Sequence, residues 1–385
     1  MKIIPFYLPQ FHEIPENDEW WGKGFTEWTN IRSATPLYKG HQQPKVPLNN
    51  NYYDLLNDDV KIWQAELAKK YGIYGFCYYH YWFNGKMLLE KPMEQMLDNK
   101  KIDLPFCICW TNEPWSKAWI GNERKVLIPQ KYGDKPEWKA HFDYLLKFFK
   151  DDRYITEDGM PIIIIYRPYI IPCIKEMMAY WKELAIKSGF PGLKVMCIIS
   201  DSHIDDTDSY NCFDNIIEWQ PHLARSIKKE SGNRLVEELK KIRRQIINVY
   251  EKTTGKDWNQ IDLLSKMYSE KSMRFQTYDD IWNIILNMKP VRSNSIPGSF
   301  VRWDNSPRYH ERATIIKGET PEKFKSYLSR QIKHAKQEYN TDKLFMFAWN
   351  EWCEGGYLEP DEDNGYKYLE AIKDALIENN EFPSL

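Results

Sequence analysis

The stretch LFMFAWNEWCEG, residues 344–355, decides the fold, because it joins an apolar run to a polar and aromatic tail. An apolar run without alternation is typical of a strand that is buried on both faces of a parallel sheet. The tail places two carboxylates, Glu351 and Glu354, three residues apart between tryptophans. Paired carboxylates break glycosidic bonds, and aromatic faces bind pyranose rings. The stretch therefore predicts a strand that ends in a sugar-handling site; an exposed turn with core tryptophans is the plainer alternative.

The same order, an apolar run followed by polar and aromatic residues, recurs along the chain. The eight runs cover residues 3–7, 73–79, 104–110, 161–166, 194–200, 214–219, 298–303 and 344–349. Apolar stripes at helical spacing lie between and after them, and these are Val60/Trp63/Leu67/Tyr71, Trp138/Phe142/Leu145/Phe149, Ile174/Met177/Trp181/Ala185, Phe324/Tyr327/Leu328/Ile332 and Tyr368/Leu369/Ile372/Leu376. Repeated strand and helix predict an α/β fold, a single (β/α)8 TIM barrel over residues 1–385, with a doubly wound sheet as the alternative.

Two long loops depart from the regular repeat. The loop after the first strand, residues 8–57, is rich in Trp, His, Pro and Asn and is expected to cover the mouth of the barrel. The loop after the sixth strand, residues 220–297, is expected to contain a helical insertion with Leu235, Leu239, Ile242 and Ile246 on one face and Lys240, Lys241, Arg243 and Arg244 on the others. We interpret this basic strip as a solvated face; a phosphate or a membrane surface is the alternative partner.

The overall composition sets limits on partners and compartment. The 53 Lys and Arg residues nearly balance the 55 Asp and Glu residues, which gives a net charge of -2, so no nucleic-acid partner is expected. The N-terminus lacks the features of a signal peptide, and no apolar run approaches a membrane span, which predicts a cytoplasmic protein. The seven cysteines are expected to be reduced, and because no metal-ligand motif accompanies them, neither a metal nor another cofactor is expected.

Chemistry-bearing side chains follow almost every run, and a TIM barrel gathers the carboxyl ends of its strands at one mouth. The residues expected at this mouth are Tyr7, His12, Trp28, His80, Tyr81, Trp82, Trp110, Asn112, Glu113, Trp115, Tyr166, Glu218, Trp303, Asp304, Asn350, Glu351 and Glu354. Aromatic and amide side chains suit the C–H faces and the hydroxyls of sugars. We therefore interpret Glu113, Glu351 and Glu354 as catalytic candidates and the others as substrate-binding residues.

Six motifs in order carry a resemblance that covers nearly the whole chain. They are YLPQFH (7–12), WGKGFTEW (21–28), GFCYYHYW (75–82), WTNEPW (110–115), WDNSPR (303–308) and WNEWCEG (349–355). With these motifs the chain resembles the WbsX-type proteins, a branch similar to glycoside hydrolase family 99 that is often found with polysaccharide and O-antigen genes. The resemblance implies a (β/α)8 barrel that acts on an oligosaccharide or polysaccharide.

The resemblance also implies roles for two glutamates. The family 99 hydrolases are retaining endo-acting α-mannosidases, and their signature resembles WNEWHEG. Carried over position by position, it gives Glu351 the role of base toward the sugar's own 2-hydroxyl and Glu354 the role of general acid and then base. This sequence departs from the signature at Cys353, where the hydrolases carry histidine, and a cysteine does not reproduce the hydrogen bonding of an imidazole.

The residues alone support one acid and one base. Glu354 must be neutral to donate a proton, and a negative charge on Glu351 favours its neutral form, so Glu354 is expected to be the more shielded. A competing assignment pairs Glu113 with Glu351 as acid and nucleophile across the barrel.

We expect an enzyme that cleaves or transfers glycosidic bonds of a mannose-type or related polysaccharide. The first alternative is a glycosyltransferase of O-antigen or surface-polysaccharide biosynthesis, which would need a phosphorylated donor. No Gly-rich phosphate loop is evident for it, and we interpret the aspartates at 205, 206 and 208 as part of a solvated loop. The second alternative is a glycan-binding protein without catalysis, which the presence of both Glu351 and Glu354 disfavours.

Overall fold

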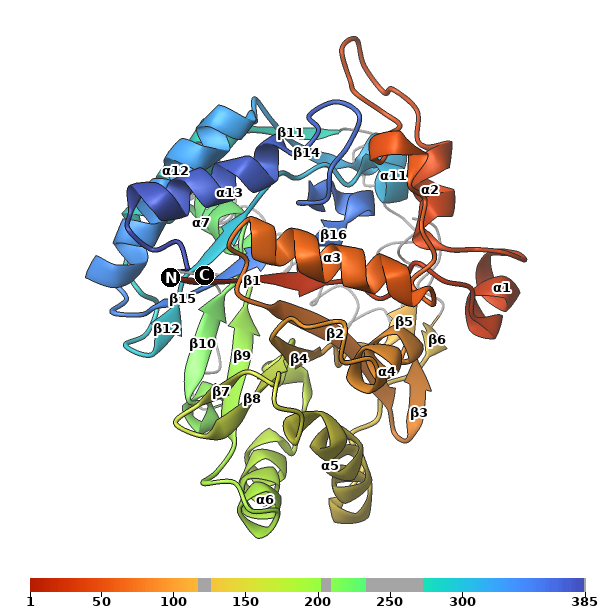
Figure 1. Ribbon diagram of the computed structural model, residues 1–385, viewed down its shortest axis with the longest axis vertical. Coiled ribbons are helices and arrows are strands. Elements are labelled where there is room, and N and C mark those ends of the chain that lie inside the picture. The colour runs from red at the N-terminus through yellow and green to blue at the C-terminus, as the bar shows by residue number, and fades with distance from the viewer. Residues whose placement is uncertain (117–125, 202–208, 233–272, 384–385) are drawn as a thin grey trace, which may run out of the picture.

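The computed structural model describes residues 1–116, 126–201, 209–232 and 273–383. Its main sheet is a barrel of parallel strands in the order β12-β10-β9-β8-β4-β2-β1-β15-β13 (Figure 1). The strands are β1 Lys2–Tyr7, β2 Phe76–Phe83, β4 Phe106–Trp110, β8 Met160–Ile165, β9 Lys194–Ile199, β10 Asn215–Glu218, β12 Ser295–Ile296, β13 Gly298–Phe300 and β15 Lys343–Phe347. Each of the eight predicted apolar runs overlaps one of these strands.

The barrel closes through a seventh strand that is interrupted at Pro297. β12 pairs with β10 and β13 pairs with β15, and only Pro297 lies between β12 and β13. A side chain at Gly298 would not fit, because a Cβ there would lie 2.0 Å from the backbone oxygen of Glu218. The two short strands together take the place of one barrel strand, so the predicted (β/α)8 barrel is confirmed.

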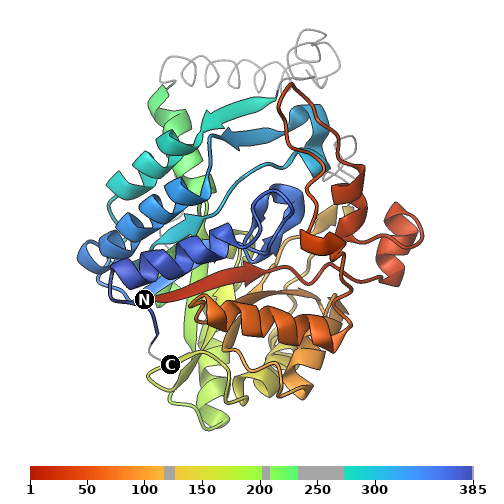
Figure 2. The same ribbon diagram turned by 45° about the horizontal axis from the view of Figure 1, so that its top comes forward.

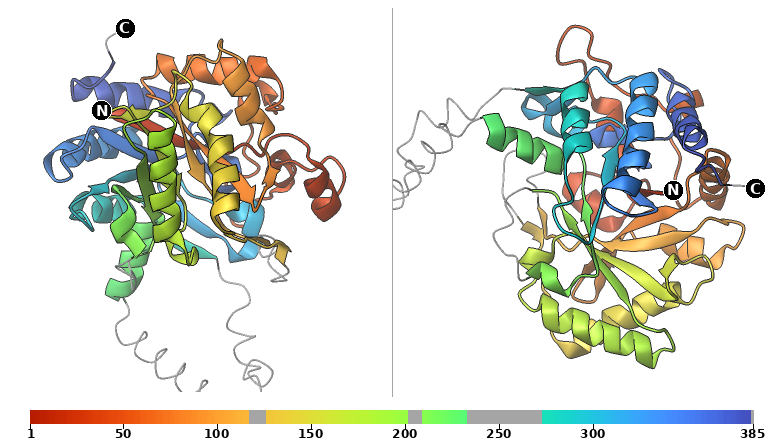
Figure 3. Two further views of the ribbon diagram at one scale, coloured as in Figure 1. Left: turned by 90° about the horizontal axis from the view of Figure 1, so that it is seen from below. Right: turned by 90° about the vertical axis from the view of Figure 1, so that its left-hand side faces the viewer.

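Helices cover the outer face of the barrel (Figures 1 and 3). They are α3 Asp58–Lys70, α4 Lys91–Asp98, α5 Lys135–Phe149, α6 Ile174–Lys187, α7 His222–Gly232, α10 Tyr278–Asn287, α12 Pro321–Gln337 and α13 Lys367–Glu378. α5 packs beside α6, and α12 packs beside α13. The predicted apolar stripes of α5, α6, α12 and α13 face the core, and the Thr320 hydroxyl caps α12 by accepting from the Lys323 amide at 3.2 Å.

α3 matches its predicted stripe at Leu67 and Tyr71, which are buried, but departs from it in the first two turns. Val60 and Trp63 are half-buried, whereas Lys61 and Gln64 are buried. The Lys61 ammonium donates to the backbone oxygen of Leu55 at 2.6 Å, and Gln64 is hydrogen-bonded on both sides of its amide. These polar partners outweigh the apolar pattern, because a buried polar group is tolerated where it is hydrogen-bonded.

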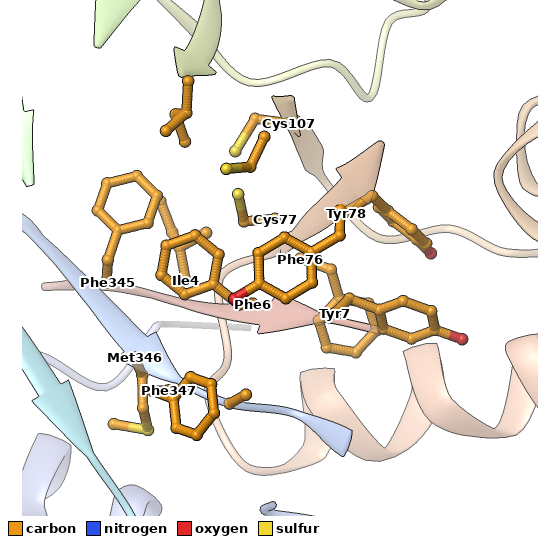
Figure 4. Packing of buried hydrophobic residues seen from close by; sticks show 14 of the residues in the cluster. Ile4, Phe6, Tyr7, Phe76, Cys77, Tyr78, Cys107, Phe345, Met346 and Phe347 are labelled. Carbon is orange, nitrogen blue, oxygen red and sulfur yellow. The ribbon is translucent and has the colours of Figure 1, made fainter. Parts of the chain in front are cut away.

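The layer between β1, β2 and α3 is filled by aromatic rings (Figure 4). The ring of Tyr7 lies 4.5 Å from that of Tyr78 and 5.2 Å from that of Phe76. The Tyr7 hydroxyl donates to Gln64 of α3 at 2.7 Å. Tyr7 therefore lies on the outer face of the barrel, although it is the last residue of its strand.

The loop after β1 lies over the carboxyl ends of the strands (Figure 2). It contains α1 Pro15–Trp21, α2 Glu27–Ser33 and the 3-10 helix Leu48–Asn50. α2 packs against the 3-10 helix η7, Trp352–Glu354, and against α11, Ser306–Tyr309. The prediction that residues 8–57 cover this end of the barrel is consistent with these contacts.

The long loop after β10 contains α7, a strand and α10. The strand β11, Arg274–Thr277, pairs in parallel with β14, Thr314–Lys317, outside the barrel (Figure 2). The predicted apolar stripe 235–246 and the basic strip 240–244 lie outside the described residues. The smaller strands are β3 Lys86–Leu88, β5 Trp115–Ser116, β6 Val126–Ile128, β7 Thr156–Glu157, β16 Asn350–Glu351 and β17 Gly356–Tyr357.

Candidate active site

A cavity of about 240 Å3 opens at the carboxyl ends of the barrel strands. It is lined by Tyr79, Tyr81, Thr111, Glu113, Tyr166, Arg167, Trp219, His222, Arg308, Tyr309, Phe347, Glu351 and Glu354. The three glutamates predicted to be catalytic thus face one space, together with Tyr81 and Tyr166 from the predicted binding residues. This is the end of the barrel at which TIM-barrel enzymes have their active sites.

A tight turn after β15 carries Glu351 and Glu354. β16 and β17 form a short antiparallel pair, and η7 lies between them. Gly355 closes the turn at φ 66, and a Cβ there would lie 2.8 Å from the backbone nitrogen of Asp304. That nitrogen donates to the Glu354 carbonyl at 2.8 Å. Asn350 fixes the start of the turn, because its side chain accepts from Leu8 N at 2.7 Å and donates to Leu8 O at 2.9 Å.

Arg308 of α11 joins three carboxylates. Its guanidinium lies 2.9 Å from Glu354 Oε1, 3.4 Å from Glu351 Oε2 and 3.1 Å from Glu27 Oε2. Arg308 and Glu27 are buried, so these charges interact in a medium of low polarity. One guanidinium cannot neutralise three carboxylates, and the excess negative charge favours the uptake of a proton by the group.

Burial raises the pKa of Glu351 well above its usual range; the Arg308 charge opposes this shift, and the charges of Glu354 and Glu27 add to it. Burial also raises the pKa of Glu354, again against the effect of Arg308. The side chain of Glu351 is 7% exposed and that of Glu354 is 17% exposed. The expectation that Glu354 is the more shielded is therefore reversed, because Glu351 lies at the base of the turn and Glu354 lies further along η7.

Glu113 lies in the same cavity beside a second arginine. It forms an ion pair with Arg167, which also donates to the Tyr169 hydroxyl. Burial raises the pKa of Glu113 and the Arg167 charge opposes that shift. Asn112 holds the arginine in place, since its side chain donates to Arg167 O at 2.8 Å and accepts from Arg167 N at 2.8 Å.

Alternation along β2 decides which of its predicted residues reach the cavity. Successive side chains of a strand point to opposite faces of the sheet. Tyr79 and Tyr81 point inward and line the cavity. His80 and Trp82 point outward, where the His80 ring nitrogen lies 3.0 Å from that of His141 in α5 and Trp82 stacks on the same histidine.

Other predicted binding residues also lie outside the cavity lining. They are Tyr7, His12, Trp28, Trp110, Asn112, Trp115, Glu218, Trp303, Asp304 and Asn350. Glu218 illustrates the reason, because it points outward from β10 and accepts from the Tyr339 hydroxyl at 2.6 Å and the Val291 amide at 2.7 Å. Asp304 likewise accepts from His41 at 2.8 Å and Gln43 at 2.9 Å beside a neighbouring pocket.

Two of the predicted tryptophans support the lining from behind. Trp115 meets Tyr81 edge-on at 5.2 Å, and Trp303 meets His222 edge-on at 4.6 Å. Burial lowers the pKa of His222 well below its usual range, so this histidine is a neutral hydrogen-bonding group at pH 7.

Several lining residues were not predicted from the sequence. These are Tyr79, Thr111, His222, Arg308, Tyr309 and Phe347. Arg308 closes the motif WDNSPR, which was the signal available for it. Tyr79 directly precedes His80 in β2, so the prediction missed it by one position in the strand.

Among the residues that the structure describes, no three His, Cys, Asp or Glu side chains form a group that could hold a metal ion. No helix in the same part of the chain has the length and the apolar character needed to cross a membrane.

Comparisons with solved structures support the fold. The structure is similar to the GH99 endo-alpha-mannosidase from Bacteroides thetaiotaomicron, with a TM-score of 0.55 and 11% identity over 98% of this chain and 96% of that chain. It is also similar to a structure described as a glycoside hydrolase-like protein, with a TM-score of 0.52 and 11% identity over 100% of this chain and 94% of that chain. At this identity the likeness shows the fold alone.

Comparisons of sequence identify the family. The chain is 33% identical over 377 residues to the protein WxcX of Xanthomonas campestris pv. campestris. The aligned region covers 97% of this chain and 49% of WxcX, so the chain spans about half of that protein's length. Residues 3–372 match the family described as Glycosyltransferase WbsX. The chain therefore belongs to the WbsX glycosyltransferase family, a family of carbohydrate-active enzymes.

Proposed function

We propose that this chain cleaves or transfers glycosidic bonds of a mannose-type or related polysaccharide by a retaining mechanism with two glutamates. The observation that carries the proposal is the contact of Glu351 and Glu354 with one guanidinium, that of Arg308, inside a cavity lined by aromatic side chains. A coupled pair of carboxyl groups that shares one proton supplies both a base and an acid at one pH.

The electrostatics of the cavity favour such a shared proton. Burial raises the pKa of Glu351 and of Glu354, and Glu27 adds a third carboxyl group to the same arginine. Glu351 takes the proton of the sugar's 2-hydroxyl as the 2-oxygen bonds to C1, while Glu354 protonates the leaving oxygen as its bond to C1 breaks. Glu354 then takes a proton from the incoming hydroxyl, whose oxygen bonds to C1 as the 2-oxygen leaves C1 and recovers its proton from Glu351. The more exposed side chain of Glu354 suits a group that meets both the leaving group and its replacement.

Tyrosine and tryptophan rings suit the sugar. Tyr166 meets Tyr79 edge-on at 6.2 Å and Trp219 edge-on at 6.0 Å, so the three rings form a connected wall of the cavity. Ring faces bind the C–H face of a pyranose, and the neighbouring carboxylates and Thr111 bind its hydroxyls.

The test offers manno-oligosaccharides and nucleotide sugars side by side to the wild type and to Glu351→Gln, Glu354→Gln and Glu113→Gln. We expect turnover of the oligosaccharide with retained anomeric configuration, followed by NMR, and its loss in the Glu351 and Glu354 variants. An aryl glycoside with a good leaving group restores the first step only in the variant that lacks the acid. Full activity of both variants, with loss in Glu113→Gln, would move the chemistry to Glu113.

A glycosyltransferase with a phosphorylated donor is the second candidate, and the description of the family favours it. The cavity supplies two arginines, Arg167 and Arg308, but each is paired with a carboxylate. A diphosphate would therefore have to displace an existing ion pair. Turnover of a nucleotide sugar in the side-by-side assay, without cleavage of the oligosaccharide, would support this candidate instead.

A further inference from the structure

Glu359 is a buried carboxylate that lies behind the turn carrying Glu351. It is 3% exposed, and it lies two residues after the end of β17. Four side chains donate to it. Its Oε1 accepts from Gln64 Nε2 at 2.7 Å and Trp349 Nε1 at 3.1 Å, and its Oε2 accepts from the Tyr53 hydroxyl at 2.8 Å and Trp352 Nε1 at 2.7 Å.

Two of these donors belong to the turn that holds Glu351. Trp349 precedes and Trp352 follows the pair Asn350 and Glu351 in the sequence. The residues on both sides of this pair therefore donate hydrogen bonds to the same carboxyl group. Trp352 also stacks on Tyr357 at 3.7 Å, which fixes its ring from the other side.

The other two donors belong to separate parts of the fold. Tyr53 comes from the loop after β1, and Gln64 comes from α3. The Gln64 amide is itself oriented, because its oxygen accepts from the Tyr7 hydroxyl at 2.7 Å. Glu359 therefore links the turn to the barrel, to its long first loop and to a covering helix.

The four donors favour the ionised form of Glu359, and they oppose the burial that raises its pKa to about 7. A carboxylate offers about four acceptor positions, two on each oxygen, and here each oxygen accepts two hydrogen bonds. An amide or a neutral acid would replace one acceptor with a donor that faces other donors. Among the described residues no Lys, Arg or His forms an ion pair with Glu359, so the four hydrogen bonds compensate for its burial.

We propose that Glu359 is a positioning residue that holds the turn of residues 349–354, and with it Glu351, in the geometry needed for proton transfer. The proposal rests on the catalytic role assigned to Glu351 above. Loss of one hydrogen bond to a charged group in such a network frees the turn, and small displacements of a catalytic group lower the rate strongly.

The first test measures the turn without reference to activity. Hydrogen exchange is followed by mass spectrometry in peptides that span residues 344–358, in wild type, in Glu359→Gln and in a matched control, Glu137→Gln. Glu137 also accepts from an indole, that of Trp82, but lies on α5 outside the cavity lining. We expect exchange about tenfold or more faster in Glu359→Gln alone. Equal exchange in the two variants would overturn the proposal.

A second variant tests the same network in case Glu359→Gln does not fold. Trp352→Phe keeps an aromatic ring at this position and leaves Glu359 in place, but it removes the indole N–H donor. We expect it to accelerate exchange in the same peptides. The double variant is expected to exceed the larger single effect only slightly, because both changes weaken the same network of hydrogen bonds. Full additivity of the two effects would contradict a shared role.

The activity arm separates this proposal from the proposed function. With manno-oligosaccharide as substrate, we expect Glu359→Gln to lower kcat about tenfold to a hundredfold while KM changes less than about threefold, since the substrate contacts are kept. A change confined to KM would overturn the positioning role. If Glu351→Gln keeps wild-type turnover, the proposed function fails, and the exchange result still decides whether Glu359 holds the turn.

Discussion

Replacing Gly355 with alanine tests whether the turn after β15 sets the position of Glu354. Gly355 has φ 66, where a residue with a Cβ costs about 1–2 kcal/mol. The added Cβ would also lie 2.8 Å from the Asp304 nitrogen, and ordinary contacts begin at 3.4 Å, so the two backbones must separate by about 0.6 Å. That movement stretches the 2.8 Å hydrogen bond from Asp304 N to Glu354 O and costs about 1 kcal/mol more.

Gly365 provides the matched control for this change. It has φ 56, and a Cβ there meets nothing within 4 Å, so Gly365→Ala has the same backbone cost without the contact with Asp304. Urea unfolding is expected to show a loss of about 1–2 kcal/mol for Gly365→Ala and about 2–3 kcal/mol for Gly355→Ala. Activity on a manno-oligosaccharide is expected to fall roughly tenfold to a hundredfold in Gly355→Ala only. Equal losses of stability and activity in both variants would refute the reasoning.

Three further changes probe the charges and the packing around the site. Glu27→Gln removes a negative charge that raises the pKa of Glu351 and of Glu354, so the pH profile of kcat is expected to move to lower pH, and an unmoved profile would contradict the shared cluster. Burial lowers the pKa of His80 to about 3. Below about pH 6.5 this histidine therefore takes up a proton in the unfolded chain but not in the folded one, so the free energy of unfolding falls as the pH falls. Between pH 7 and pH 5, the free energy of unfolding measured in urea should therefore fall by about 2 kcal/mol less in His80→Phe than in wild type. An equal fall in both proteins would argue against a neutral His80. Cys353→Ser should keep wild-type activity, because the Cys353 thiol faces the Glu27 backbone oxygen at 3.5 Å and does not line the cavity; a large loss would show that the thiol acts on the substrate site.

The barrel could be predicted from the sequence because its strands are long apolar runs and its helices carry apolar stripes. The side of each strand that faces the cavity could not be predicted in the same way. In β2, FCYYHYWF, all eight residues are buried, so the pattern has no polar side to mark the solvent. The choice between Tyr79 and His80 depends on the register of the barrel, which only the assembled sheet determines.

The charge cluster shows a second limit of sequence patterns. Glu351 and Glu354 stand together in one motif, and their pairing follows from spacing alone. Arg308 lies more than forty positions earlier, and its role depends on the contact of α11 with η7. Residues brought together by tertiary contacts leave no local pattern, so the arginine that controls the charge of the pair was not predicted.

The long loop after β1 takes part in the electrostatics of the site as well as covering it. Glu27 begins α2 in this loop and lies 3.1 Å from Arg308, which also contacts Glu351 and Glu354. With Arg308 alone, the two glutamates of the turn would carry one excess negative charge; Glu27 makes it two. Each negative charge added to this buried cluster favours the uptake of a proton, because ionising all three carboxyl groups beside one arginine raises the free energy. The loop thus helps to retain a proton in the cluster, as the proposed pair of one acid and one base requires.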